Sequence, residues 1–138
     1  MFVKFLCLLG ATFLLTTCGD YVTDLPGGYT FVSESPDDQF ILASTESSLD
    51  SGNIPVNVTG FDYDDDFIVV RQVATAVSDS SMWDDLSGRK YNEKLGGIYY
   101  WIIDAKKLKI SGPFSEEEFE SERTRLNVSK DLCICAYR

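Results

Sequence analysis

The chain has 138 residues, with 22 acidic and 12 basic side chains and a formal net charge of −10 at neutral pH. This length suits one small domain with its own core, and so acidic a protein repels nucleic acid and anionic membrane surfaces. The sequence contains no histidine, which excludes Ser-His-Asp and Cys-His catalysis and the usual zinc sites. We therefore expect no enzyme activity, no nucleic-acid partner and no cofactor.

The first 17 residues have the pattern of an export signal. Lys4 is the only charge before Asp20, and the apolar run 5–15 has the length of a signal-peptide core but is too short to span a bilayer. The sequence that follows, Leu15-Thr16-Thr17-Cys18, resembles the lipobox of bacterial lipoproteins. The resemblance implies that Cys18 is the lipid attachment site, carries a diacylglyceryl group and becomes the mature N-terminus. The alternative is an ordinary secretory leader followed by a chance cysteine.

Lipidation at Cys18 would place the protein in a bacterial cell envelope, with the membrane as its first partner. Two acyl chains are enough for stable anchoring, so no basic patch is needed. Gly19 follows the cysteine where Asp would signal retention, a pattern that resembles sorting to the outer membrane in hosts with two membranes. The acidic charge favours a basic protein as a second partner.

The chain after the anchor is predicted to form one domain. Residues 18–28 are predicted to be a lipidated tether that ends in a Pro-Gly-Gly turn, and residues 29–138 a single α+β domain. Short strands are expected at 29–33, 40–43, 54–58 and 67–77, with polar loops at 44–53 and 78–97. Pro55 makes the strand at 54–58 an edge strand, because proline cannot donate to the ladder.

The clearest elements lie in the C-terminal part. Residues 98–103 are apolar on both faces, which predicts a central strand, followed by a turn at 104–107 and a return strand at 108–110. A helix is then predicted after Ser115, since Ser115 and Glu118 form a capping box, Phe114 and Phe119 occupy the staple positions, and Asn127 suits a left-handed cap. A last strand is expected at 132–137. The fold class is therefore α+β, a small antiparallel β-sheet with one well-capped C-terminal helix.

The acidic segment 62–66 invites comparison with calcium sites. Asp62, Asp64 and Asp66 match the first three ligand positions of an EF-hand loop, and they are the weak candidates for a metal site. The match ends there, because Phe67 occupies the glycine position and Val73 the position of the bidentate glutamate. We therefore interpret the segment as a charged turn and expect no metal.

Cys133 and Cys135 stand two apart, which places both on one face of the last predicted strand. The spacing is not that of a redox motif. A disulfide between them is geometrically awkward, so the preferred interpretation is a pair of small buried side chains, with the redox state left open.

Four segments give a second resemblance. Cys18 to Tyr21, Leu25 to Tyr29, Tyr100 to Asp104 and Gly112 to Phe119 resemble a family of short bacterial lipoproteins classified as a domain of unknown function. The resemblance runs from Cys18 to about Leu126. It implies a location and a fold, and no reaction.

Two classes of function follow from the residues. The first is a lipid-tethered protein-binding module, such as an inhibitor, an immunity-type protein or an envelope assembly factor. The second is a small envelope enzyme or carbohydrate-binding protein that uses carboxylates and aromatics, which would need a pocket containing Trp83 or Trp101. On a two-sided strand, Trp101 is expected in the core, so the binding module is preferred.

Overall fold

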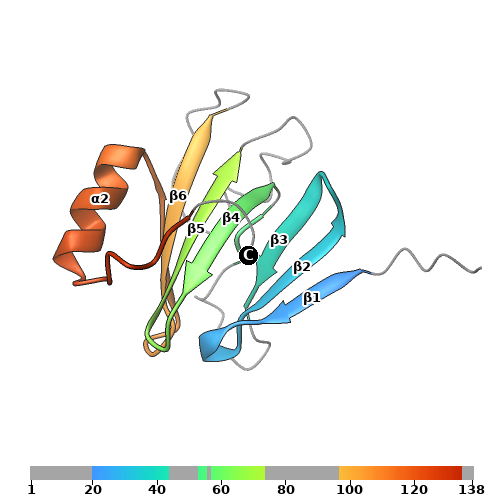
Figure 1. Ribbon diagram of the computed structural model, residues 1–138, viewed down its shortest axis with the longest axis horizontal. Helices are drawn as coiled ribbons and strands as arrows, with labels where there is room; N and C mark the ends of the chain where they lie inside the picture. Colours follow the sequence, from blue (N-terminus) through green and yellow to red (C-terminus); the bar gives the residue numbers. More distant parts are fainter. Residues whose placement is uncertain (1–19, 44–52, 56, 74–96, 135–138) are drawn as a thin grey trace, which may run out of the picture.

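The structure, a computed structural model, describes residues 20–43, 53–55, 57–73 and 97–134 (Figure 1). Two antiparallel sheets and a C-terminal helix give an α+β fold, as predicted, although the strands divide into two sheets where one was expected. Sheet A has the strand order β1-β2-β3 and sheet B the order β4-β5-β6-β7. The elements are β1 Tyr21–Asp24, η1 Pro26–Gly28, β2 Thr30–Ser35, β3 Asp38–Leu42, β4 Val58–Tyr63, β5 Phe67–Val73, β6 Ile98–Asp104, β7 Lys109–Phe114 and α2 Glu116–Arg125.

Sheet B is the middle layer of the molecule, with sheet A on one side and α2 on the other (Figure 1). Its side chains alternate between the two faces: Ile68 and Val70 pack toward sheet A, and Val69 between them packs toward α2. Because both faces are covered, a strand of this sheet is apolar on both sides. This explains β6, which lies between β5 and β7 as the predicted central strand.

Each interface has its own core. Between the sheets, Tyr29, Phe31 and Ile41 of the sheet A region meet Trp101 and Ile103 of β6, all at most 3% exposed. The indole Nε1–H of Trp101 donates to Gln72 Oε1 at 2.9 Å, so the buried nitrogen has an acceptor. Between sheet B and α2, a second core contains Val69, Ile102, Phe114, Phe119, Val128 and Leu132.

The predicted tether contains a strand. β1 pairs antiparallel with β2 after a turn at η1. Within this turn Gly27 has φ 74°, and a Cβ there would lie 2.6 Å from the carbonyl oxygen of Ala105, so no other residue fits. The sequence does not predict β1, because Tyr21 and Val22 point to opposite faces and are 58% and 56% exposed. They therefore lack the alternation of a half-buried strand.

The edge strand predicted at 54–58 is displaced. β4 begins at Val58, and Ile54 forms only an isolated antiparallel bridge with Ile41. In that bridge each amide nitrogen lies 2.9 Å from the carbonyl oxygen of the other residue. The bridge links sheet A to the segment that leads into sheet B.

The β6–β7 hairpin continues further than predicted, since β7 extends to Phe114. Asp104 closes its turn by accepting the backbone N–H groups of Lys107 and Lys106 at 2.9 and 3.2 Å, and the Lys107 ammonium lies 3.3 Å from its other oxygen. Burial opposes ionisation of Asp104, but the hydrogen bonds and the charge of Lys107 outweigh burial and lower the pKa of this carboxyl group.

The low pKa of Asp104 gives the turn a defined pH dependence. A depressed pKa in the folded state stabilises the fold above the pKa of the unfolded chain, and this contribution is lost as the pH falls through the folded value. We therefore expect stability to fall below about pH 4, and less steeply in Asp104→Asn. Urea denaturation of both proteins at pH 2.5 to 7 measures this, and identical slopes would contradict it.

The helix has the predicted signals at both ends. Ser115 Oγ accepts the N–H of Glu118 at 3.2 Å, and the Glu118 carboxylate accepts the N–H of Ser115 at 2.8 Å, which completes the capping box. Asn127 ends the helix with φ 55°, as expected for a left-handed cap. Within the described ranges, no helix has the length and apolar character needed to cross a membrane.

Replacing Ser115 with alanine should lower the free energy of unfolding by about 1 kcal/mol, because the N–H of Glu118 loses its acceptor. Ser121 in the same helix is exposed and serves as a matched control, since Ser121→Ala should leave stability unchanged or slightly raised. Urea denaturation followed by circular dichroism compares the two variants. An equal loss in both would show that the cap contributes nothing.

The last predicted strand is wrong in its described part. Residues 132–134 have no regular secondary structure, and residues 135–138 lie outside the description. The segment instead lies against the α2 side of sheet B, where Val128 and Leu132 are buried in the second core. Its backbone forms hydrogen bonds with side chains, and Asp62 Oδ2 accepts the N–H of Cys133 at 2.8 Å.

Candidate functional site

The three aspartates proposed as weak metal ligands have separate structural partners. Asp62 accepts from the backbone of Cys133, and Asp64 accepts the N–H groups of Asp66 and Phe67 at 2.9 and 2.8 Å. Asp66 lies 2.5 Å from the ammonium of Lys106 and raises the pKa of that lysine by hydrogen bonding and charge. Among the described residues, no three His, Cys, Asp or Glu side chains are grouped to hold a metal ion.

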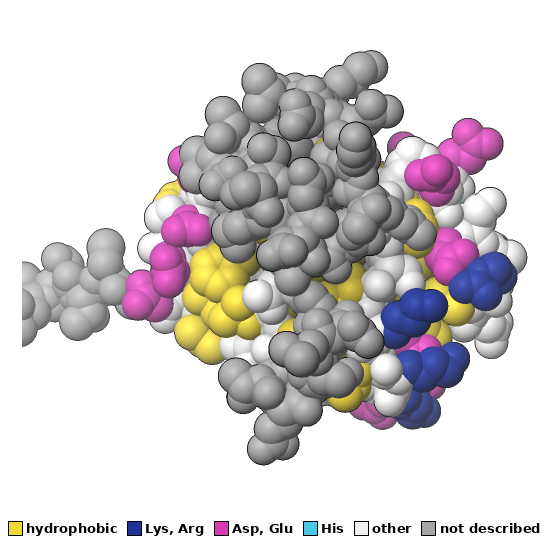
Figure 2. Space-filling view, turned by 180° about the vertical axis from the view of Figure 1, so that it is seen from behind, with side chains coloured by type: hydrophobic (Ala, Val, Ile, Leu, Met, Phe, Trp, Pro, Cys, Tyr) yellow, Lys and Arg dark blue, Asp and Glu magenta, His cyan; other side chains and the backbone are white. Residues whose placement is uncertain are grey.

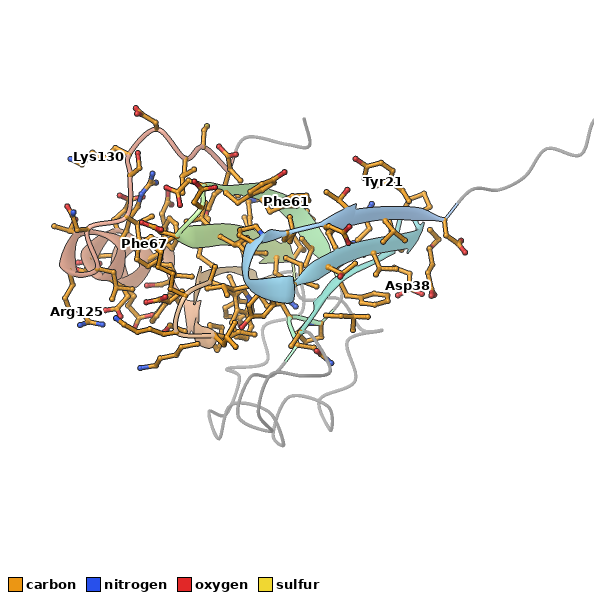
Figure 3. All side chains as sticks on the ribbon, turned by 90° about the horizontal axis from the view of Figure 1, so that it is seen from below. Tyr21, Asp38, Phe61, Phe67, Arg125 and Lys130 are labelled. Atoms are coloured by element: carbon orange, nitrogen blue, oxygen red, sulfur yellow. The ribbon has the colours of Figure 1, made fainter. Side chains whose placement is uncertain are left out.

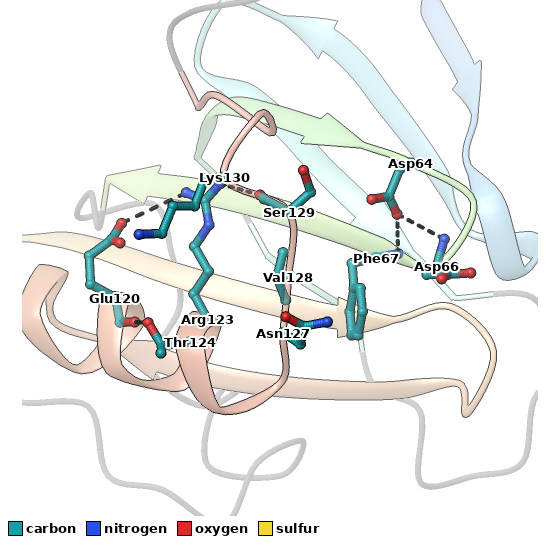
Figure 4. Close-up of a pocket in the computed structure, with 10 residues that line it drawn as sticks. All are labelled: Asp64, Asp66, Phe67, Glu120, Arg123, Thr124, Asn127, Val128, Ser129 and Lys130. Atoms are coloured by element: carbon teal, nitrogen blue, oxygen red, sulfur yellow. Dashed lines mark hydrogen bonds and ion pairs between the residues drawn. The ribbon is translucent and has the colours of Figure 1, made fainter.

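Two pockets flank α2. The first, of about 390 Å³, lies between the β4–β5 turn and the loop after α2 (Figure 4). Asp64 and Asp66 line one side, and Glu120, Arg123 and Lys130 line the other. Its charges are mixed, with three carboxylates and two cations.

The second pocket, which we call the helix-side groove, has a volume of about 320 Å³ and lies between α2 and the C-terminal segment. Arg71 and Tyr100, paired across β5 and β6, contribute from sheet B, and the Tyr100 ring stacks on Phe119 with centroids 5.1 Å apart. Leu132 and Ile134 line it from the C-terminal segment. The groove therefore combines an apolar surface with charged walls.

Arg123 lines both pockets and joins the C-terminal segment to α2. Its guanidinium donates to the carbonyl oxygens of Ser129 and Leu132, the latter at 2.7 Å, and lies 3.8 Å from the Glu120 carboxylate. The side chain is buried, yet its Nε has no hydrogen-bond partner. An unpaired buried donor is costly, so an acceptor that reached this nitrogen would remove that cost.

Arg123 lies in the last turn of the helix, where a cation complements the helix dipole. The structure gives it a larger role, because it stands four residues after Phe119 and so shares the buried face of the helix. That spacing was the signal that could have identified it. Arg125, by contrast, is exposed and pairs with Glu122.

The described cysteine differs from its predicted state. Cys133 is disulfide-bonded and exposed, and it lines the helix-side groove. The prediction of a small buried side chain was wrong, because the irregular backbone here turns residue 133 outward while Leu132 enters the core. Cys135, Cys18 and Trp83 lie outside the described residues.

The aromatic block 99–101 contains a core residue, as expected. Trp101 is 3% exposed and packs between the sheets, so it offers no platform to a ligand. Tyr100 belongs to the helix-side groove through its contact with Phe119. The envelope enzyme or carbohydrate-binding alternative therefore gains no accessible tryptophan at this position.

Sheet A presents an apolar row on the face turned away from sheet B. Val22, Val32 and Phe40 lie directly opposite one another across β1, β2 and β3. Val22 is 56% exposed and the other two are half-buried, while the alternating residues Phe31 and Ile41 are in the core. The row is accessible at its β1 end.

The charged residues of the segment that forms sheet A all have the same sign. Residues 20–43 contain five carboxylates and no lysine or arginine. The carboxylates are Asp20, Asp24, Glu34, Asp37 and Asp38. Figure 2 shows acidic side chains next to hydrophobic ones where the chain enters the domain, and the lysines and arginines gather at the opposite side. We call this row with its carboxylates the sheet A surface.

The comparisons identify a family without an assigned activity. A family model described as "Protein of unknown function (DUF3997)" matches residues 26–135, which is most of the chain. Neither the curated proteins nor the solved structures gave a match. The match supports the resemblance to an uncharacterised family that the sequence motifs indicated.

Proposed function

The chain belongs to the DUF3997 family of proteins of unknown function, and we propose that it is a lipid-anchored protein of the bacterial cell envelope that binds a basic partner protein. In hosts with two membranes, the residue after Cys18 favours the outer membrane as its location. The proposal has two parts, an anchor at Cys18 and a binding surface on sheet A, and each has its own test.

The anchor is supported by the export signal and by the chemistry of Cys133. Disulfides persist in oxidising compartments outside the cytoplasm and are rare inside it. A chain with a disulfide at Cys133 is therefore suited to the extracytoplasmic side of a membrane. β1 begins at Tyr21, so only two residues, Gly19 and Asp20, separate this strand from the proposed lipid on Cys18. The sheet A surface would then lie close to the bilayer.

The binding function rests on one observation, the apolar row of sheet A together with the carboxylates of residues 20–43, a stretch that contains no lysine or arginine. Stable protein interfaces have an apolar centre and a polar rim, and complementary charge steers the partners together. An acidic rim disfavours a second copy of this chain and an anionic bilayer alike. A basic protein surface with an apolar centre fits both features.

Mass spectrometry of the full-length protein purified from bacterial membranes tests the anchor. We expect a mature chain that begins at Cys18 and carries a diacylglyceryl group, and a Cys18→Ser variant that is not lipidated and leaves the membrane fraction. In a host with two membranes, the wild type should sediment with the outer membrane. An unmodified Cys18 thiol in the wild type would overturn the anchor.

Cross-linked affinity purification from the native host tests the surface. The variant Val22→Lys places a cation in the apolar row, and Ile98→Lys makes the same change at a similarly exposed position of sheet B. We expect one basic protein to be recovered with the wild type and with Ile98→Lys, and to be lost with Val22→Lys. Recovery that is insensitive to Val22→Lys would show that sheet A is not the interface, whatever the result for Cys18.

A further inference from the structure

The helix-side groove is separate from the sheet A surface. Figure 3 shows Tyr21 and Asp38 at one end of the molecule and Arg125 and Lys130 at the other. Lys130 lines the groove, so the groove lies at the end of the molecule away from the acidic sheet A surface. Its charge is also reversed, since three cations, Arg71, Arg123 and Lys130, face two carboxylates, Glu116 and Glu120.

Each of the three cations has N–H donors without a partner among the described residues. One nitrogen of Arg71 donates to Thr59 Oγ1 at 2.7 Å, and no other described side chain bonds this guanidinium. Lys130 is exposed and forms no ion pair within the described part of the chain. Arg123 is more than nine-tenths buried, and its Nε is without an acceptor. All three side chains line one groove of about 320 Å³, where a single acceptor group can lie near them.

The remaining walls restrict the chemistry of that acceptor. Two carboxylates against three cations leave one net positive charge, which attracts an anionic group. Tyr100, Phe119, Leu132 and Ile134 supply an apolar surface beside the cations. Guanidinium groups pair with planar carboxylates through two parallel hydrogen bonds.

We propose that the helix-side groove binds a carboxylate attached to an apolar body, with the carboxylate at Arg71, Arg123 and Lys130 and the body against Tyr100 and Phe119. This chemistry has two sources in an envelope, the C-terminal end of a peptide and a fatty acid. The proposal does not depend on the lipid at Cys18 or on the sheet A surface.

The test is an NMR titration of the full-length protein in nanodiscs. N-acetyl-leucine represents a peptide end and hexanoate a fatty acid, and N-acetyl-leucinamide and hexanol are matched controls that lack the carboxylate. We expect saturable shifts at Tyr100, Phe119 and Ile134 with a carboxylate and none with its control. Binding of N-acetyl-leucine alone identifies a peptide end, of hexanoate alone a fatty acid, and of both a site for the carboxylate itself.

Two variants separate the groove from general charge effects. Arg71→Gln should weaken binding roughly tenfold, because it removes one charge-assisted hydrogen-bond donor without touching the bonds of Arg123. Lys109→Gln removes one positive charge at an exposed position of β7, outside the groove, and should leave binding unchanged. The proposal is overturned if neither carboxylate gives saturable shifts, if the controls bind equally, or if the two variants have the same effect.

Discussion

Replacing Trp101 with alanine is expected to lower the free energy of unfolding by about 3–5 kcal/mol, the usual cost of removing a buried aromatic side chain. Trp101 is 3% exposed and belongs to the core between the two sheets. Its loss leaves a cavity where sheet A packs on sheet B, and the surrounding structure fills such a cavity only in part.

Two contacts of Trp101 cannot be replaced by a smaller side chain. The indole Nε1–H of Trp101 donates to Gln72 Oε1 at 2.9 Å, and a smaller side chain removes that bond inside the core. The indole also packs on Gly112, where an added Cβ would lie 2.8 Å from Trp101 Cε3, so the backbone of β7 fits closely to the ring. Trp101→Phe keeps most of the packing but loses the hydrogen bond, and should have an intermediate effect.

Urea denaturation followed by circular dichroism provides the measurement. Val22→Ala is the control for removing apolar atoms at an exposed position, and it should change stability by less than about 0.5 kcal/mol. A loss below about 1 kcal/mol for Trp101→Ala would mean that the two sheets do not depend on this side chain.

Local signals predicted the helix well. Ser115 and Glu118 define its start and Asn127 its end through contacts within a few residues, so these features need no knowledge of the tertiary structure. β6 was predicted for a related reason, because its two apolar faces report burial on both sides. Both elements are recognisable from a short window of sequence.

Features that depend on pairing between distant segments were predicted less well. Periodicity indicates that a strand exists but not which strand it joins, so the division into two sheets was not predictable. β1 has no buried face of its own and is a strand only through its hydrogen bonds to β2. The described part of the strand expected at 132–137 is irregular, because the N–H of Cys133 bonds to the Asp62 carboxylate instead of a neighbouring strand.

In the candidate sites, too, local features were visible in the sequence and features that join distant segments were not. The charge of the sheet A surface is visible in the sequence, since residues 20–43 contain no cation, but its apolar row follows from the register of three strands. The helix-side groove joins residues of β5, β6, α2 and the C-terminal segment. No short motif encodes that combination. In the acidic segment that the sequence emphasised, Asp62 and Asp64 accept backbone N–H groups and Asp66 pairs with Lys106.

Arg123→Met should cost roughly 2–4 kcal/mol, because a buried guanidinium holds the C-terminal segment on sheet B and hydrogen bonds to charged groups contribute about 1.5–3 kcal/mol each. The change removes donors from the carbonyl oxygens of Ser129 and Leu132, and methionine retains much of the apolar stem of the arginine. The contact between the guanidinium and the Phe119 ring, 5.8 Å from the centroid, is lost as well.

We expect Arg123→Met to destabilise the C-terminal segment before it affects the whole fold. We expect amide hydrogen exchange in residues 128–134 to accelerate in Arg123→Met, while β5 and β6 stay protected. Arg125→Met is the matched control from the same helix, since Arg125 is exposed and pairs only with Glu122 among the described residues, and it should cost less than about 0.5 kcal/mol. Equal exchange in the two variants would mean that Val128 and Leu132 hold the segment through the second core without help from Arg123. A selective increase would establish that this one side chain determines whether the wall of the helix-side groove is in place.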